Sequence, residues 1–254
     1  MQQVAIRKEK LNYQVREAYK TLRTNVELSG ENVKVIALTS CTPGEGKSTV
    51  SFYLAKSFAE NGDRTLFIDA DLRKSVLRRR HSKGKLRLGL TNYLAGGAEA
   101  GEVITKTDVE NFDIIFSGPF PPNPSELLGS ERFENLIRIA RANYDVVIID
   151  TPPLGSVIDT VVASKFCDGV IMVVSAGEIS YHFALDIKDQ LDKANAKILG
   201  VVLNKVRFGG GSAYGKYYGK YYGKYYGKYY GKYYGKYYGR YGFDDESEKD
   251  KKKS

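Results

Sequence analysis

Short runs of apolar residues alternate with longer amphipathic segments over the first 206 residues of the chain. The apolar runs predict six buried strands, at residues 33–39, 65–70, 112–118, 145–150, 169–176 and 198–206. Helical periodicity and stop signals predict helices at about residues 13–28, 47–60, 131–143 and 180–194. The strand runs are apolar without alternation, so we expect helices to cover both faces of the sheet.

Strands that alternate with helices are typical of right-handed βαβ crossovers. The order of elements therefore predicts an α/β domain built on a doubly wound, mostly parallel sheet of at least six strands, with helices on both faces. Ligands of such sheets bind beyond the carboxyl ends of the strands. Polar residues end several of the predicted strands, which places a candidate site at that edge.

A glycine-rich loop joins the first predicted strand to the following helix. Residues 41–49 read CTPGEGKST, which fits a P-loop except that Cys41 replaces the first glycine of the full pattern. Glycines let backbone N–H groups turn toward an anion at a helix N-terminus. We expect Lys47 on the β/γ-phosphates and Ser48 on Mg²⁺. The nucleotide-binding candidates in the loop are Gly44, Glu45, Gly46, Lys47, Ser48 and Thr49.

Acidic residues follow two other predicted strands. Asp69 and Asp71 lie in LFIDADLR at 66–73, and Asp150 lies in VVIIDTPP at 146–153. A carboxylate at the end of a buried strand is destabilising unless a cation or a hydrogen-bond network balances it. With Ser48, these acids predict a Mg-nucleotide site; the alternative for each is an aspartate that caps a helix.

Composition divides the chain into two parts. Of its 254 residues, 42% are hydrophobic, enough for a packed core, and the formal net charge is +9. Residues 209–254 hold +6 of that charge and 14 of the 20 tyrosines. We therefore predict an ordinary domain at 1–208 and a distinct tail at 209–254. The two histidines, His81 and His182, are expected at the surface.

The tail repeats Gly-Lys-Tyr-Tyr with a period of four between Tyr214 and Tyr241. Such a repeat cannot build a packed core, so we expect it to be disordered in the free chain. Basic residues interleaved with aromatics suit single-stranded nucleic acid, and tyrosine-rich repeats self-associate. Taken alone, the tail leaves open a nucleic-acid binder, a self-association element and a phosphoacceptor cluster.

Three motifs together resemble those of the bacterial tyrosine kinases, the P-loop kinases of capsule and exopolysaccharide systems. PGEGKST resembles their Walker A motif, LFIDADLR their Walker A′ motif and VVIIDTPP their Walker B motif. SGPFPPNPSELLGS at 117–130 resembles a loop of that family. EAYKTLR at 17–23 resembles its N-terminal helix motif ExxRxxR, with Lys20 in place of the middle arginine. The resemblance covers nearly all of residues 1–208, implies a P-loop NTPase fold, and extends in kind to the tail.

The resemblance implies an ATP-dependent protein tyrosine kinase that phosphorylates its own tail in trans. It implies Mg-ATP rather than GTP, with catalytic roles for Lys47, Asp69, Asp71 and Asp150, and metal roles for Ser48 and the same three acids. We favour Asp69 over Asp71 as the base that accepts the tyrosine proton. Asn204 either faces the adenine or only ends its strand. The phosphoacceptors would be Tyr214, Tyr217, Tyr218, Tyr221, Tyr222, Tyr225, Tyr226, Tyr229, Tyr230, Tyr233, Tyr234, Tyr237, Tyr238 and Tyr241.

The resemblance also implies partners. An N-terminal helix within residues 1–30 would join subunits into a ring through Glu17, Lys20 and Arg23, and the subunits would phosphorylate one another. A transmembrane polysaccharide co-polymerase would act as the activator. We expect the chain to be cytoplasmic, because it has no apolar run of membrane-spanning length. The activator would recruit it to the inner face of the cell membrane. The chain would then regulate capsule or exopolysaccharide synthesis or export. Other proteins could also be substrates, and nucleic acid is not an expected partner.

Two other functions stay open. A ParA- or MinD-like positioning ATPase shares this fold, but such proteins usually carry a lysine early in the P-loop, where this chain has Thr42 and Pro43, and lack a tyrosine tail. A nucleotide-gated binding module would instead use the basic, aromatic tail to bind nucleic acid or acidic polysaccharide.

Overall fold

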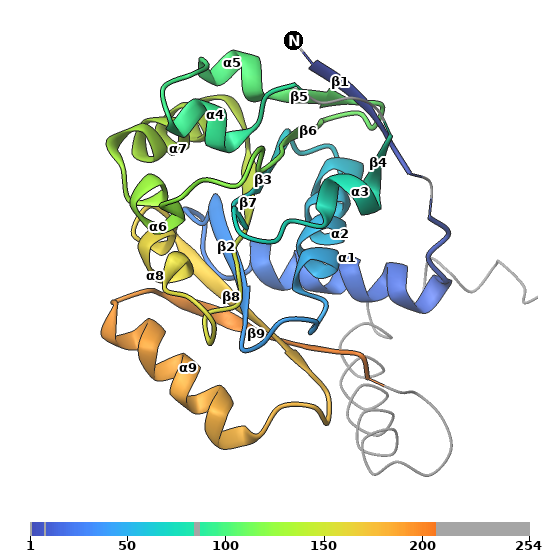
Figure 1. Ribbon diagram of the computed structural model, residues 1–254. Coiled ribbons are helices and arrows are strands. Elements are labelled where there is room, and N and C mark those ends of the chain that lie inside the picture. Colours follow the sequence, from blue (N-terminus) through green and yellow to red (C-terminus); the bar gives the residue numbers. More distant parts are fainter. Residues whose placement is uncertain (1, 8, 84–86, 207–254) are drawn as a thin grey trace, which may run out of the picture. The chain divides into compact units, whose positions relative to one another are not determined.

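The computed structural model describes residues 2–7, 9–83 and 87–206 (Figure 1). These residues, apart from Val206, belong to the first of the two units into which the chain divides, Met1–Lys205 and Val206–Ser254. The predicted boundary at 208 and the tail at 209–254 lie outside them. Within the described ranges, no helix is long and apolar enough to cross a bilayer.

Strands and helices follow one another in the order that the sequence predicts. The strands are β1 (Gln2–Ile6), β2 (Val35–Ser40), β3 (Thr65–Asp69), β4 (Ser82–Lys83), β5 (Thr105–Thr107), β6 (Phe112–Ile115), β7 (Val146–Asp150), β8 (Gly169–Ser175) and β9 (Ile198–Asn204). The helices are α1 (Tyr13–Glu27), α2 (Lys47–Glu60), α3 (Leu77–His81), α4 (Leu90–Leu94), α5 (Ala100–Val103), α6 (Pro124–Leu128), α7 (Glu131–Asn143), α8 (Asp159–Ser164) and α9 (Tyr181–Lys193). All six predicted strands and all four predicted helices are present.

The strands form one sheet in the order β4-β1-β5-β6-β3-β7-β2-β8-β9. The β1–β4 and β5–β6 pairs are antiparallel and the other pairs are parallel. The predicted mostly parallel sheet is therefore confirmed. The sequence did not reveal β1, β4 and β5, because they are only five, two and three residues long.

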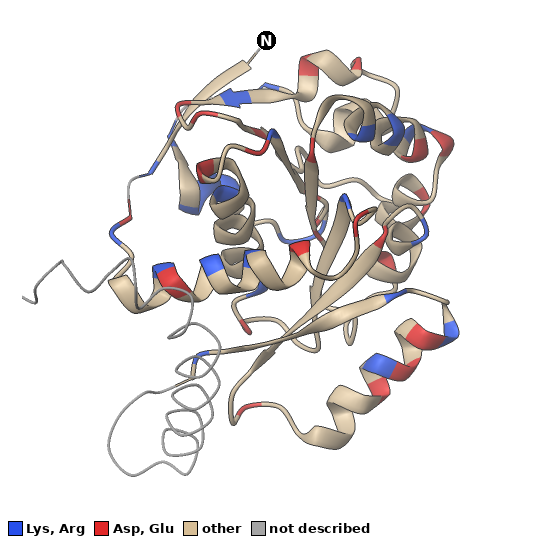
Figure 2. Ribbon diagram, turned by 180° about the vertical axis from the view of Figure 1, so that it is seen from behind, with Lys and Arg blue, Asp and Glu red and all other residues tan. Residues whose placement is uncertain are grey.

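Apolar layers cover both faces of the sheet, as predicted. In β2, the side chains of Val35 and Ala37 join one layer, and those of Ile36 and Leu38 join the other. Helices α1, α2 and α3 pack on the second layer, while α4 to α9 pack on the first (Figure 1). Charged residues are frequent along α1 and α9 (Figure 2), whereas every residue of β2, β3 and β7 is buried. Burial therefore explains the continuous apolar character of the central strands.

The expectation of two surface histidines is wrong for one of them. His182 is exposed, but His81 is buried at the end of α3. Its ring stacks on that of Phe52 in α2, with centroids 4.1 Å apart, and neither ring nitrogen has a hydrogen-bond partner in the described structure. Burial lowers the pKa of His81, so the apolar contact favours the neutral imidazole.

Strand order brings the predicted site together. The strands β3, β7 and β2 are adjacent and parallel, so their carboxyl ends lie at one edge of the sheet. Asp69 at the end of β3 pairs in register with Asp150 at the end of β7. The glycine-rich loop leaves the end of β2 on the other side of β7. The topology therefore gathers all three sequence motifs at one place.

Candidate active site

Two glycines shape the loop between β2 and α2. Gly44 and Gly46 have φ values of 89° and 88°, in a region that other residues enter at an energetic cost. Gly46 precedes the first turn of α2, and within the described part of the chain no side chain caps that turn. Thr49 in the same turn accepts a hydrogen bond from Nη1 of Arg80 at 3.3 Å. The uncapped N–H groups of a 14-residue helix provide an anion site of the P-loop kind.

Lys47 forms a buried ion pair at the start of α2. Its Nζ lies 2.7 Å from Oδ1 of Asp150 and 3.3 Å from Oγ of Ser48. The side chains of Lys47 and Asp150 are 6% and 0% exposed. Ser51 donates to the same Asp150 oxygen at 2.8 Å. Each charge is therefore balanced by a direct partner inside the protein.

Asp69 lies beside this pair. Its Oδ2 accepts hydrogen bonds from the hydroxyl of Ser75 and, at 3.4 Å, from the N–H of Ser117. Its Oδ1 and the Oδ2 of Asp150 are buried and have no hydrogen-bond partner in the described structure. Burial, and then the charge of Asp150, raise the pKa of Asp69 to about 7. Unpartnered carboxylate oxygens on adjacent strand ends point to a cation or a proton as their partner.

The donor set fits Mg²⁺. Proteins usually bind this ion through one or two carboxylates, and its other ligands are phosphate oxygens, water or a P-loop hydroxyl. The unpartnered oxygen of Asp150 supplies such a carboxylate, and Ser48 supplies the hydroxyl. The unpartnered oxygen of Asp69 is available either to the ion or to a proton. Among the described residues, no three His, Cys, Asp or Glu side chains form a cage of their own. That arrangement agrees with an ion that arrives together with a nucleotide.

Asp71 has a different environment. Its Oδ1 accepts hydrogen bonds from the backbone N–H groups of Arg73 at 3.3 Å and Lys74 at 3.0 Å. The carboxylate therefore caps the turn that follows β3. This role is similar to the helix-capping aspartate that the sequence left open as an alternative. A metal or catalytic role for Asp71 stays a prediction.

Two predicted nucleotide-binding residues brace the P-loop. Glu45 is buried, and its carboxylate accepts hydrogen bonds from the N–H of Thr42 and, at 2.9 Å, from the N–H of Ser175 at the end of β8. Asn204 at the end of β9 donates from Nδ2 to the carbonyl oxygen of Glu45 at 2.8 Å. A Cβ atom on Gly46 would lie 2.2 Å from that Nδ2. These contacts fix the loop to two strand ends, while direct contact of either side chain with nucleotide stays a prediction.

An ion pair that the sequence did not reveal supports the turn after β3. Asp159, buried at the start of α8, accepts two hydrogen bonds from Arg73, at 2.9 Å from Nε and 3.0 Å from Nη2. Ser125 of α6 donates to the same carboxylate at 2.6 Å. Arg73 lies 86 residues from Asp159 along the chain, beyond the reach of any local pattern.

The predicted subunit-contact residues divide into two kinds. Glu17 and Lys20 form an exposed ion pair of 2.7 Å on α1. Arg23 instead donates from Nη1 to the carbonyl oxygen of Ser57 in α2, at 2.8 Å. Arg23 therefore holds α1 against α2 within its own chain, and a subunit contact through these residues stays a prediction. The predicted phosphoacceptor tyrosines lie outside the described residues.

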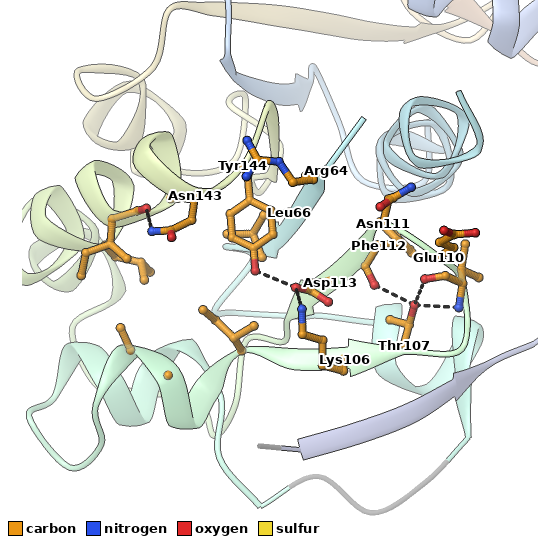
Figure 3. Close-up of a pocket in the computed structure, with 17 residues that line it drawn as sticks. Arg64, Leu66, Lys106, Thr107, Glu110, Asn111, Phe112, Asp113, Asn143 and Tyr144 are labelled. Carbon is orange, nitrogen blue, oxygen red and sulfur yellow. Dashed lines mark hydrogen bonds and ion pairs between the residues drawn. The ribbon is translucent and has the colours of Figure 1, made fainter. Parts of the chain in front are cut away.

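A cavity of about 640 Å³ lies away from the candidate active site, at the amino ends of β3 and β6 (Figure 3). In its wall, Oδ2 of Asp113 accepts hydrogen bonds from Nζ of Lys106 at 2.6 Å and from the hydroxyl of Tyr144 at 2.7 Å. Burial, and then the bond to Asp113, raise the pKa of Tyr144. None of the predicted nucleotide-binding residues lines this cavity. The cavity's size alone therefore does not locate the candidate active site.

Strand β2, the glycine-rich loop after it and the buried pair of Lys47 and Asp150 define a nucleotide-binding domain of the P-loop class. Residues 33–199 match the family described as AAA domain. The chain is 40% identical over 205 residues to tyrosine-protein kinase CpsD of Streptococcus agalactiae, and the match covers 79% of this chain and 90% of the relative. It is 38% identical over 205 residues to tyrosine-protein kinase YwqD of Bacillus subtilis, covering 79% and 85%. The chain therefore belongs to the bacterial tyrosine-protein kinases.

Solved structures agree with this assignment. The chimerical protein CapA2B2 superposes with a TM-score of 0.73 at 34% identity, covering 81% of this chain and 94% of that one. The kinase domain of Escherichia coli tyrosine kinase ETK gives 0.70 at 32% identity, covering 78% and 80%. The septum site-determining protein MinD of Pyrococcus horikoshii, complexed with Mg-ADP, gives 0.57 at 25% identity, covering 67% and 70%. The expected kinase assignment is confirmed, and the positioning-ATPase alternative has weaker support.

A third relative has a longer chain. The putative tyrosine-protein kinase EpsB of Ralstonia solanacearum is 37% identical over 208 residues, which cover 79% of this chain but only 28% of EpsB. In that protein, the matching kinase region is therefore part of a larger polypeptide.

Proposed function

We propose that this kinase transfers the γ-phosphoryl group of Mg-ATP to tyrosines of its own C-terminal tail, in trans between subunits. The observation that carries the proposal is the buried pair of Lys47 and Asp150 beside the P-loop, with unpartnered oxygens on Asp69 and Asp150. The tail supplies 14 tyrosines between Tyr214 and Tyr241. A lysine, a hydroxyl and strand-end carboxylates are the parts that phosphoryl transfer uses.

Each part has a defined task. The N–H groups of residues 44–49 and Nζ of Lys47 hold the phosphates, and Ser48 and Asp150 hold Mg²⁺. When bound, Mg²⁺ would neutralise charge on the transferred phosphoryl group. Most of the rate acceleration comes from positioning and charge neutralisation, because the transition state needs little covalent chemistry from the protein.

Asp69 would accept the proton of the attacking tyrosine. A free phenol has a pKa of about 10, so a nearby base assists its attack. The hydrogen bonds from Ser75 and Ser117 hold one oxygen of Asp69 in place and leave the other unpartnered. Asp71, whose Oδ1 is bound to backbone N–H groups, is the less suitable base.

The kinase would act in a homo-oligomeric ring at the inner face of the cell membrane. The exposed pair of Glu17 and Lys20 on α1 is available for subunit contacts. A transmembrane polysaccharide co-polymerase would recruit and activate it, and capsule or exopolysaccharide synthesis or export would be the regulated process. The larger polypeptide of EpsB supports a kinase unit that works together with further segments.

Complementary full-length variants test transfer in trans. One carries Lys47→Ala and serves only as acceptor; the other keeps Lys47 but has phenylalanine at every tail tyrosine. With Mg-ATP, we expect phosphotyrosine on the Lys47→Ala chain only when both chains are mixed. Phosphate on the Lys47→Ala chain alone, or none in the mixture although the intact chain becomes phosphorylated, would exclude the proposed transfer between subunits.

A further inference from the structure

A second cavity, of about 440 Å³, opens beside the candidate active site. Its wall comes from the turn after β3, from α3 and from the loop after β6. Ser75 and Ser117, which both donate hydrogen bonds to Asp69, line it. The wall of this cavity therefore directly contacts the proposed base.

The wall is cationic. Arg73, Lys74, Arg78 and Arg87 line the cavity, and among the residues that the structure describes no acidic residue does. Arg73 is paired with the buried Asp159. The side chains of Lys74, Arg78 and Arg87 are exposed and have no partner among the described residues. Three unpaired cations around one concave site favour an anionic ligand.

The remaining lining is apolar and partly aromatic. Leu72, Leu88 and Phe116 contribute to the wall, and so does Phe120, with 67% of its surface exposed. A large exposed aromatic side chain can stack on another ring, and cations next to it can bind a charged group on that ring. The combination suits a ligand that is both aromatic and anionic.

We propose that this cavity binds a phosphotyrosine in the tail of a second copy of the chain, and so helps to present the next tyrosine to Asp69. The inference rests on the proposed function. The unmodified tail carries a lysine or arginine every four residues between Lys216 and Arg240, so a cationic wall disfavours it. A phosphate adds about −1.5 to −2 charges and three acceptor oxygens. Tail phosphorylation would therefore become faster after the first phosphate.

The spacing of the tail agrees with this arrangement. Tyrosine pairs recur every four residues from Tyr217 to Tyr238. A bound phosphotyrosine therefore always has another tyrosine within four residues, or at most about 14 Å of extended chain. Each new phosphotyrosine can in turn occupy the cavity, so one binding site serves the whole repeat.

An anionic membrane is the competing partner for a basic surface. The unpaired cations surround a concave wall together with Phe120, whereas Arg79 on the same helix is exposed but does not line the cavity. A flat lipid surface would contact both Arg78 and Arg79. The structure favours a single aromatic anion.

The direct test measures peptide binding to the unphosphorylated full chain by fluorescence anisotropy. The probe is GKYYGKYYGKYY from residues 215–226, with or without one phosphotyrosine. We expect the phosphopeptide to bind at least about tenfold more tightly. Arg78→Gln and Arg87→Gln should each weaken its binding by about 10- to 100-fold, because each removes charged hydrogen bonds. The matched control is Arg79→Gln, which should leave binding unchanged.

Equal binding of both peptides, or an equal loss with Arg79→Gln, would overturn the proposal. So would binding to vesicles of phosphatidylserine and phosphatidylcholine that depends on Arg78 and Arg87 when the phosphopeptide does not bind. Thermal melting of each variant checks that the fold is retained.

A second readout follows the number of phosphates per chain. We expect the intact chain to pass quickly from one phosphate to several, and Arg87→Gln to accumulate singly phosphorylated molecules. Tail phosphorylation without phosphopeptide binding would overturn this inference alone. Phosphopeptide binding without phosphorylation in any sample would instead count against the proposed kinase reaction.

Discussion

Nζ of Lys47 and Oδ1 of Asp150 are 2.7 Å apart, with both side chains almost fully buried. Arg64 and Asp145 are separated by the same distance, but their side chains are 60% and 42% exposed. Water and salt screen the second pair, whereas the first pair has no such screening. Loss of the buried pair should therefore lower the free energy of unfolding more than loss of the exposed pair, although the two pairs have the same N–O distance.

We predict that Lys47→Met lowers the free energy of unfolding by about 3–5 kcal/mol, because it leaves Asp150 as an uncompensated buried charge. The matched change Arg64→Met should lower it much less, because solvent screens the exposed pair. Urea denaturation without nucleotide measures both. Equal losses for the two variants would contradict the burial argument.

The two P-loop glycines should respond differently to substitution. Both have φ near 90°, so alanine at either position introduces backbone strain of about 1–3 kcal/mol. At Gly44 a Cβ meets no atom of the described residues within 4 Å, whereas at Gly46 it meets Nδ2 of Asn204. We therefore expect Gly46→Ala to be more destabilising than Gly44→Ala in thermal unfolding. Adding Asn204→Ala should recover part of the difference; no recovery would show that the close approach to Asn204 is unimportant.

Glu45 should affect nucleotide affinity through the shape of the loop. Its carboxylate accepts hydrogen bonds from the N–H groups of Thr42 and Ser175. Its loss leaves the buried N–H of Ser175 unsatisfied, which costs about 1–3 kcal/mol. We predict that Glu45→Ala binds Mg-ADP about tenfold more weakly. The increase in Tm at saturating Mg-ADP reports this affinity. Glu60→Ala, at the exposed end of the same helix, is the control and should keep the full increase.

His81 should make stability depend on pH. Burial holds the pKa of its ring below the value in the unfolded chain; the charge of Arg80 adds to the shift and that of Glu9 opposes it. The unfolded chain then binds the proton more readily, so this contribution is intact above about pH 6.5 and is lost as the pH falls below it. We expect His81→Phe to lose less stability than the unaltered chain between pH 7.5 and 5.5. His182→Phe, at an exposed position, should behave like the unaltered chain; equal pH dependence in all three would refute the prediction.

The sequence predicts those parts of the fold that depend on local pattern. The predicted bounds of α2 and α7 agree with the structure because glycine, asparagine and apolar spacing mark them locally. The five-residue strand β1 could not be found in this way. It lies near the edge of the sheet, and its partners are in β5 and β4, about 100 and 80 residues along the chain. Its register depends on long-range packing, which apolar periodicity does not contain.

The same distinction applies to the site. Lys47, Asp69 and Asp150 were predicted because each ends a strand or begins a helix in a motif whose chemistry is recognisable. The bond from Asn204 to Glu45 and the pair of Arg73 with Asp159 join residues 159 and 86 positions apart. Residue type alone also misplaced His81, whose ring is apolar enough to stack on Phe52. Such contacts follow from topology and not from a local signal.

The most direct test of the kinase assignment is intact-mass spectrometry after incubation with Mg-ATP, in the presence and absence of a candidate activating segment. The full chain and its Lys47→Ala variant are compared, and the modified residues are located by peptide fragmentation. The account predicts stepwise additions of one phosphate mass in the full chain only, on tyrosines between Tyr214 and Tyr241. ADP release that depends on Lys47, with no phosphate on the chain even when the activator is present, would contradict it and favour a positioning ATPase.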